Sequence, residues 1–271
     1  MAEFFEALSF PFMYRALIAG ALIALCAALL GVSLVLKRYS MIGDGLSHVG
    51  FGAMALAAAL NAAPLAVALP VVVAAAFLLL WFGRRSEVKG DAAIAVVSAI
   101  SLAVGVMLVS LTGGGNVDLM NYMFGSILGM KQADLWLSVG LAVAVVAVYV
   151  VLYNRIFAIT FDETFAGATG VHSGLINTVL AVLTAVTVVL GMRLVGALLI
   201  SSLIIFPVLS SMRIFRSFRG VCVSASVISV SSLVAGVIAS YFLSTPTGAS
   251  IVCVEALVLA VFWLIGKIRR K

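Results

Sequence analysis

The sequence predicts an all-α integral membrane protein, a polytopic bundle of eight or nine transmembrane helices in a single domain that spans residues 1–271. The composition is the first observation: 65% of the residues are hydrophobic, 10% are charged, and the mean hydropathy is +1.30. Soluble proteins carry about 45–50% apolar and about 25% charged residues. The second observation is that the apolar residues form runs of about 20, the length an α-helix needs to cross a bilayer.

Nine such runs follow one another along the chain. They lie near 14–36, 40–60, 64–82, 91–111, 134–153, 172–191, 194–212, 221–243 and 248–266. Two of them are less certain to cross, which leaves the count at eight or nine. The run at 40–60 is interrupted by glycines, and the run at 194–212 contains Pro207 and follows Arg193 closely.

The Lys and Arg residues fall mainly on one side if every run crosses. Thirteen of the 16 follow the first, third, fifth, seventh and ninth runs, and the other side keeps Arg15, Lys131 and Arg193. Basic residues concentrate in cytoplasmic loops. The sequence therefore predicts a multi-pass protein of the cell (plasma) membrane with a cytoplasmic C-terminus.

The sequence lacks the motifs that are typical of several other functional classes. The formal charge of +6 is accounted for by cytoplasmic loops, so no nucleic acid partner is expected. No glycine-rich run ends in Gly-Lys-Ser/Thr, and neither His-Glu-x-x-His nor Gly-x-Ser-x-Gly occurs. We therefore expect a non-catalytic subunit with no permanently bound cofactor, and an intramembrane enzyme is the weakest hypothesis.

The segment MIGDGLSHVG, residues 41–50, places Asp44 and His48 in an apolar run. Four residues apart, the two side chains share one face of a helix. If the helix begins near Ser40, His48 lies about 12 Å deep at 1.5 Å per residue. An ionisable pair at that depth should face a bundle interior or an aqueous path. The pair fits half of a divalent-metal site, proton handling, or structural pairing between helices.

The segment KRYSMIGDGLSHVGFGAMALA, residues 37–57, resembles the signature of the high-affinity zinc and manganese uptake permeases. These are the membrane subunits of metal-importing ABC transporters, which have a type II ABC importer-like fold. Further similar segments, in the same order, are FGSILGM at 124–130, FDETFAGATG at 161–170, GMRLVGALLISSLIIFPVLSS at 191–211 and STPTGASIV at 244–252. One departure is Gly50-Phe51-Gly52, where many members have Leu-Pro-Gly, and it leaves the choice of metal open.

The resemblance implies a homodimeric permease with its pathway on the twofold axis. A pair of cytoplasmic ATP-binding subunits would drive it, and an extracytoplasmic metal-binding lipoprotein would deliver Zn²⁺ or Mn²⁺ as transported substrate. Asp44 and His48 would then be the metal ligands. The alternative from another class is a proton-coupled metal carrier that works without an ATPase, with Asp44 as the proton shuttle.

The connection RIFAITFDETFAGATG, residues 155–170, is expected on the cytoplasmic side. Thr160 and Glu163 have the spacing of a capping box for a short helix. Phe161 and Phe165 would share one face of that helix, which would end at Gly167 or Gly170. Such a helix lies on the membrane surface or docks into a partner. The resemblance makes it the ATPase-coupling element, formed by Asp162, Phe165, Ala166 and Gly170.

One further acid, Glu255, lies within the last apolar run. A lone glutamate in lipid is costly, so its side chain should face protein or water. Two roles are open: lining an outer gate, or pairing with a neighbouring hydroxyl group.

Overall fold

The computed structural model describes residues 11–85, 90–112 and 132–269, and all regular structure in these ranges is helical. Within the described residues nine helices are long and two, α8 and α9, are short. Their bounds are α2 Pro11–Leu36, α3 Ile42–Ala59, α4 Pro64–Arg85, α5 Gly90–Leu111, α7 Gln132–Val151, α8 Tyr153–Phe161, α9 Glu163–Ala168, α10 Ser173–Val195, α11 Ala197–Ile214, α12 Phe218–Leu243 and α13 Thr247–Arg269. The predicted all-α bundle is confirmed, and each of the nine apolar runs coincides with a long helix.

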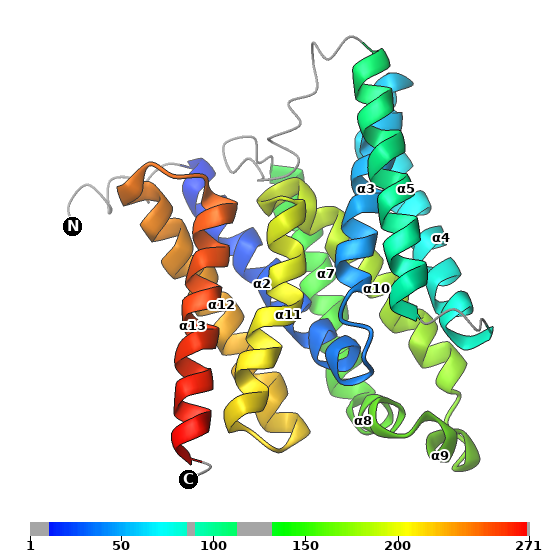
Figure 1. Cartoon of the computed structure of the whole chain (residues 1–271), viewed down its shortest axis with the longest axis vertical. Coiled ribbons are helices and arrows are strands. Elements are labelled where there is room, and N and C mark those ends of the chain that lie inside the picture. The colour runs from blue at the N-terminus through cyan, green and yellow to red at the C-terminus, as the bar shows by residue number, and fades with distance from the viewer. Residues whose placement is uncertain (1–10, 86–89, 113–131, 270–271) are drawn as a thin grey trace.

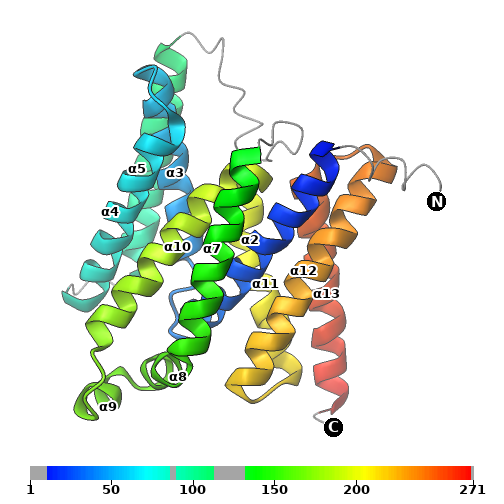
Figure 2. The ribbon, with the colours of Figure 1, turned by 180° about the vertical axis from the view of Figure 1, so that it is seen from behind.

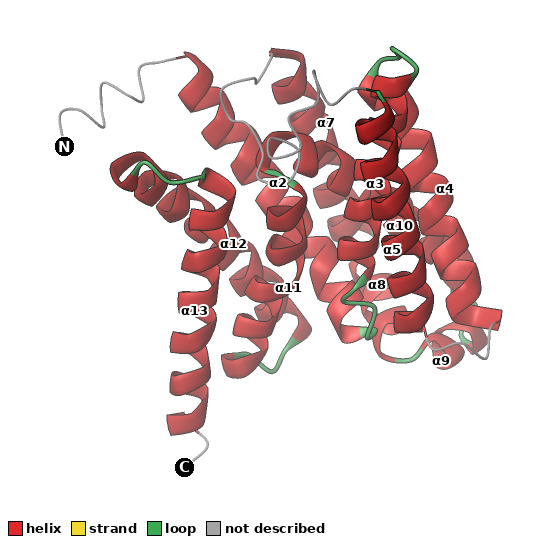
Figure 3. Ribbon diagram, turned by 45° about the horizontal axis from the view of Figure 1, so that its top comes forward, coloured by secondary structure: helices red, strands yellow, loops and turns green. Residues whose placement is uncertain are grey.

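The long helices run alternately up and down the bundle, joined by connections at its two ends (Figures 1 and 3). The short helices α8 and α9 lie at the end where α13 finishes (Figures 1 and 2). The C-terminal ends of α2, α4, α7 and α11 point toward this same end (Figure 1). The described basic residues of these connections therefore gather where α8 and α9 lie, the end that the charge distribution assigns to the cytoplasm.

The lengths of these helices agree with membrane crossing. Six helices in the described residues combine at least 18 residues with high hydropathy, and α4 and α11 contain shorter apolar stretches. The helix α3 has 18 residues and includes Asp44 and His48. At 1.5 Å per residue, 18 residues extend about 27 Å, close to the thickness of a hydrocarbon core.

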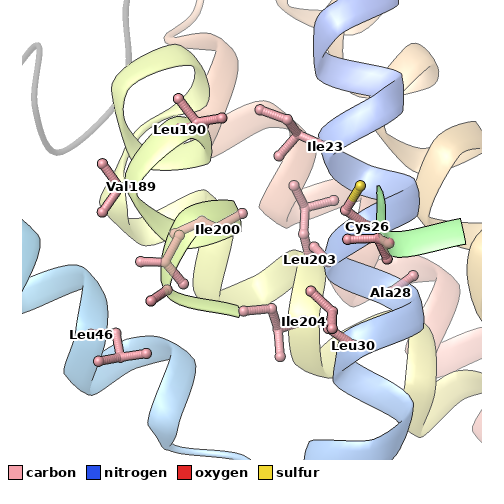
Figure 4. Close-up of a cluster of buried hydrophobic side chains, with 14 of the residues drawn as sticks. Ile23, Cys26, Ala28, Leu30, Leu46, Val189, Leu190, Ile200, Leu203 and Ile204 are labelled. Atoms are coloured by element: carbon pink, nitrogen blue, oxygen red, sulfur yellow. The ribbon is translucent and has the colours of Figure 1, made fainter. Parts of the chain in front are cut away.

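Helix α2 occupies the centre of the bundle, in contact with α7, α10, α11 and α12. Its buried side chains are mostly small, including Ala24, Ala27 and Ala28. Ile23 and Leu30 of α2 are also buried and lie near Leu203 and Ile204 of α11 (Figure 4). Small residues let helix backbones approach closely, which is the main source of helix association in lipid.

Two glycines mark the closest backbone approaches. A Cβ atom on Gly31 of α2 would overlap the carbonyl oxygen of Ile204 in α11. A Cβ atom on Gly52 of α3 would lie 2.7 Å from the carbonyl oxygen of Ser101 in α5. The glycines that interrupt the second apolar run thus serve helix packing, and α3 remains a continuous helix.

A single residue, Gly196, separates α10 from α11. Its φ of 96° lies in the region that favours glycine, which explains how the chain reverses within one residue. Beside this turn, Arg193 Nη1 lies 2.8 Å from Oδ1 of Asp134, whose side chain is 6% exposed. This ion pair joins the last turn of α10 to the first turn of α7 at the end opposite α8 and α9 (Figure 1).

The substitution Gly31→Ala is expected to destabilise the bundle, because the added methyl group would force α2 away from the backbone of α11. Overpacking of this kind costs about 1–3 kcal/mol. Gly140→Ala in α7 is the matched control, since nothing lies within 4 Å of the added Cβ. Thermal unfolding of the detergent-solubilised variants measures the difference. Equal midpoints for the two variants would contradict this account of α2 packing.

Candidate functional site

Asp44 and His48 lie on one face of α3 and contact each other. His48 Nε2 is 3.5 Å from Asp44 Oδ2, and the two side chains are 23% and 34% exposed. Asp44 is in the first turn of α3, where the partial positive charge of the helix N-terminus favours a carboxylate. The predicted shared helix face is confirmed, and both groups keep an exposed side.

Asp44 also contacts α11. Ser201 Oγ lies 3.2 Å from Asp44 Oδ1 and donates a hydrogen bond to it. A cavity of about 510 Å³ opens beside this contact, between α3, α11 and α13. Its lining residues are Met41, Asp44, Ser201, Ser202, Ile205, Phe206, Gly248, Ala249, Val252 and Cys253. The carboxylate of Asp44 is thus held by a neighbouring helix at the wall of a cavity.

This contact places the start of α3 against α11. Asp44 lies in the first turn of α3, and Ser201 lies in the second turn of α11, which begins at Ala197. The two residues are 157 positions apart in the sequence, so only the packing of α3 on α11 brings them together.

Glu255 lies in α13, which packs against α11 and α12. It is 1% exposed, so it faces protein, as expected. Ser202 of α11 lies against its carboxyl group, but the Ser202 hydroxyl donates to the carbonyl oxygen of Leu199 at 2.9 Å. Among the described residues neither oxygen of Glu255 has a hydrogen-bond partner. The predicted pairing with a hydroxyl group is therefore not formed in this part of the chain.

The connection after α7 differs from its prediction in where the short helix begins. The expected capping box at Thr160 is wrong, because Thr160 lies in the last turn of α8 and donates to the carbonyl oxygen of Ile156. The next helix, α9, is capped by Asp162, whose Oδ1 accepts from the N–H of Phe165 at 2.9 Å. Asp162 has extended backbone angles, and α8 and α9 are therefore separate helices.

The two phenylalanines consequently do not share a helix face. Phe161 belongs to α8, and its ring lies 5.0 Å from Phe157 and 6.2 Å from Phe218, centroid to centroid. Phe165 belongs to α9 and is 65% exposed. Ala166 is fully buried, and Gly170 has a φ of 85°. Phe165 is thus the exposed apolar side chain of α9, while Ala166 packs that helix onto the protein.

The remaining motifs fall in different places. The segment 124–130, which supports the family resemblance, lies outside the described residues. His172, the second histidine of the chain, stands immediately before α10 at the end of the bundle that carries α8 and α9 (Figure 1). Sequence reasoning missed Ser201 as a partner of Asp44, because nothing in a run of apolar residues and serines shows which hydroxyl faces α3.

Comparison with models of known protein families identifies the family of this chain. The model of the ABC 3 transport family matches residues 9–266. The chain belongs to this family. The resemblance predicted from the Asp44–His48 motif is therefore confirmed, and so is the multi-pass membrane bundle.

This ABC 3 transport family protein is similar to proteins named for zinc uptake and for manganese transport, and to one solved structure. The high-affinity zinc uptake system membrane protein ZnuB of Haemophilus influenzae is 30% identical over 248 residues, which cover 91% of this chain and 95% of the relative. The manganese transport system membrane protein MntC of Halalkalibacterium halodurans is 27% identical over 257 residues, covering 95% and 88%. The solved structure of PsaBC from Streptococcus pneumoniae in complex with Fab superimposes with a TM-score of 0.84 at 27% identity, covering 98% and 94%.

The cavity beside Asp44 predicts a pattern of thiol reactivity. Cys253 lines this cavity and is exposed, whereas Cys26 and Cys222 are buried. If water fills the cavity, a membrane-impermeant thiol reagent should modify Cys253 at least about tenfold faster than the buried thiols, because the thiolate is the reactive form and burial disfavours it. Mass spectrometry of the protein in liposomes measures the three rates, with Cys253→Ser as the control. Equal rates would show that water does not reach the cavity.

Proposed function

We propose that this protein is the membrane permease subunit of an ATP-driven importer that takes up a divalent metal ion, with zinc as the first candidate cargo and manganese the second. The observation that carries the proposal is the Asp44–His48 pair, held within one helical turn at 3.5 Å and in contact with α11. The relatives named for zinc and manganese transport support the same class of cargo.

The chemistry of the pair suits a transient metal site. A neutral imidazole and an ionised carboxylate are the forms that ligate, and both side chains keep an exposed side. Imidazole favours zinc and carboxylate favours manganese, so the pair accommodates either ion. Ser201 orients the carboxylate through its hydrogen bond, as outer-shell partners do at metal sites.

One chain supplies only part of a coordination shell. Among residues 11–85, 90–112 and 132–269, no group of three or more His, Cys, Asp and Glu side chains gathers in a geometry that could hold a metal ion. A homodimer would place two carboxylates and two imidazoles around a shared pathway, which matches the four ligands of a tetrahedral zinc site. Two ligands per protomer also allow release, since the site opens when the protomers separate.

The energy source in this proposal is a pair of cytoplasmic ATP-binding subunits. The cation-rich end of the bundle carries α9, whose Phe165 presents an exposed apolar ring, and an aromatic anchor of this kind commonly fills a pocket on a partner. Asp162, Ala166 and Gly170 shape the helix that presents it. A metal-binding lipoprotein would deliver the ion at the opposite end.

The alternative, a proton-coupled carrier without an ATPase, is less favoured by membership of an ABC transport family. The deciding experiment is metal uptake by proteoliposomes with and without the purified ATP-binding subunit. Uptake that requires this subunit and ATP supports the permease. Uptake by this chain alone, driven by a pH gradient, would establish the carrier.

Replacement of either proposed metal-ligating residue should abolish metal transport, while the amount of folded protein stays the same. Asp44→Asn and His48→Ala are each expected to reduce metal uptake to the background of empty vesicles, because one of the two coordinating groups per protomer is lost. The matched control is His172→Ala, which removes the other histidine of the chain. Normal uptake by both site variants would disprove the assignment of the ligands.

Replacement of the exposed ring of α9 should weaken assembly. Phe165→Asp is expected to lower co-purification of the ATP-binding subunit by about tenfold or more, as loss of an interface anchor does. Gly170→Leu should act in the same direction, since a side chain at a φ of 85° strains the connection.

The control for assembly is Phe215→Asp, the same substitution at an exposed phenylalanine after α11, at the same end of the bundle. If the yield of the complex is equal for Phe165→Asp, Gly170→Leu and the control, α9 is not the docking helix.

A further inference from the structure

Three polar side chains from three different elements meet near the short helix α9. Lys37 Nζ donates to Asn177 Oδ1 at 2.6 Å, and Asn177 Nδ2 donates to Glu163 Oε1 at 2.9 Å. Lys37 Nζ also lies 3.6 Å from Glu163 Oε2. These contacts close a triangle, which we call the Lys37–Asn177–Glu163 triad.

Each member of the triad has a distinct place in the fold. Glu163 is the first residue of α9, and Lys37 directly follows the last residue of α2. Asn177 lies in the second turn of α10 and is 9% exposed. Lys37 is 140 residues from Asn177, whereas Glu163 is 14 residues from it, so the triad forms only when the chain folds.

The triad is partly shielded from water. The side chain of Lys37 is 12% exposed and that of Glu163 is 41% exposed. A cavity of about 350 Å³ lies beside them, and Tyr39, Ile42 and Leu46 of the turn and of α3 also line it. Charge-assisted hydrogen bonds in such surroundings are stronger than those at an open surface. A change in the position of Glu163 would therefore act directly on the ammonium group of Lys37.

The connection from Lys37 to Asp44 is short. Six residues lie between them, and Arg38 has a φ of 64°, a sharp bend for a residue other than glycine. The N–H of Ile42 donates to the carbonyl oxygen of Tyr39 at 3.1 Å, and the N–H of Gly45 donates to that of Met41 at 3.0 Å. These bonds join the turn to the first turn of α3, which carries Asp44.

We propose that Lys37, Asn177 and Glu163 are positioning residues that couple movement of α9 to the turn before α3, and thereby to the Asp44–His48 pair. The inference rests on the proposed function, in which α9 is the docking helix of the ATP-binding subunit. The triad joins that helix to the end of α2, and the α2–α3 turn transmits the displacement to the metal ligands. Coupling of this kind needs a physical element that both sites bias.

The test separates coupling from assembly. Lys37→Met and Glu163→Gln each remove one charge of the triad, and the double reversal Lys37→Glu with Glu163→Lys restores opposite charges in exchanged positions. Proteoliposomes that contain the permease, the ATP-binding subunit and the metal-binding lipoprotein are assayed for ATP hydrolysed per zinc ion taken up. Arg216→Met, which removes an exposed cation at the same end of the bundle, is the control.

Both single variants are expected to keep normal co-purification of the ATP-binding subunit and to raise the ratio of ATP to zinc by about fivefold or more, the usual lower bound of coupling between two sites. The double reversal should recover part of the loss, and Arg216→Met should behave as wild type. A merely structural role would lower the yield of folded protein and leave the ratio unchanged.

Two results would overturn the inference while the wild-type protein transports zinc with ATP. One is a normal ratio in both single variants, and the other is loss of the ATP-binding subunit from the Lys37→Met complex. Failure of the proposed function is distinguishable, because the wild-type protein itself would then show no ATP-dependent uptake.

Discussion

The close approach of α2 to its neighbours is the constraint on which the rest of this bundle depends. In a bilayer the side chains that face lipid gain nothing by association, so helices hold together through close packing and a few polar contacts. Helix α2 meets that condition with buried alanines and with Gly31 against the backbone of Ile204. Because α11 is held against α2 in this way, Ser201 has a fixed position. Asp44 then has a partner inside the bundle.

Two acidic side chains of the bundle lie beside the same helix, α11. Ser201 bonds to Asp44 of α3, and Ser202, the next residue, lies against Glu255 of α13. Two acidic side chains from different helices therefore lie near neighbouring serines, and Ser201 and Ser202 line one cavity. Ionisable groups inside a membrane protein are costly and mark pathways for ions or protons. This arrangement is consistent with the proposed passage of a metal ion between α3, α11 and α13.

The end of the bundle that the charge distribution assigns to the cytoplasm has a different design. There α8 and α9 pack on the ends of the long helices. Asp162 separates α8 from α9, and Ala166 anchors the second of them. The Lys37–Asn177–Glu163 triad then ties α9 to α2 and α10. In the proposed transporter this end receives the motion of the ATP-binding subunits, and the triad is the proposed link from α9 to the turn before α3.

The sequence by itself determined the fold class, the positions of nine apolar runs that form long helices in the described residues, the end at which the basic residues gather, the family and the shared face of Asp44 and His48. All of these follow from local properties: run length, charge along the chain, a motif, and a four-residue spacing on a helix. It did not determine the cap of α9, because Thr160 and Asp162 are both competent caps and the choice depends on where α8 ends. The bond of Asp44 to Ser201, the burial of Glu255 and the triad were decided only by tertiary structure. Each of these depends on which faces of separate helices meet, and an apolar run carries no local signal for that.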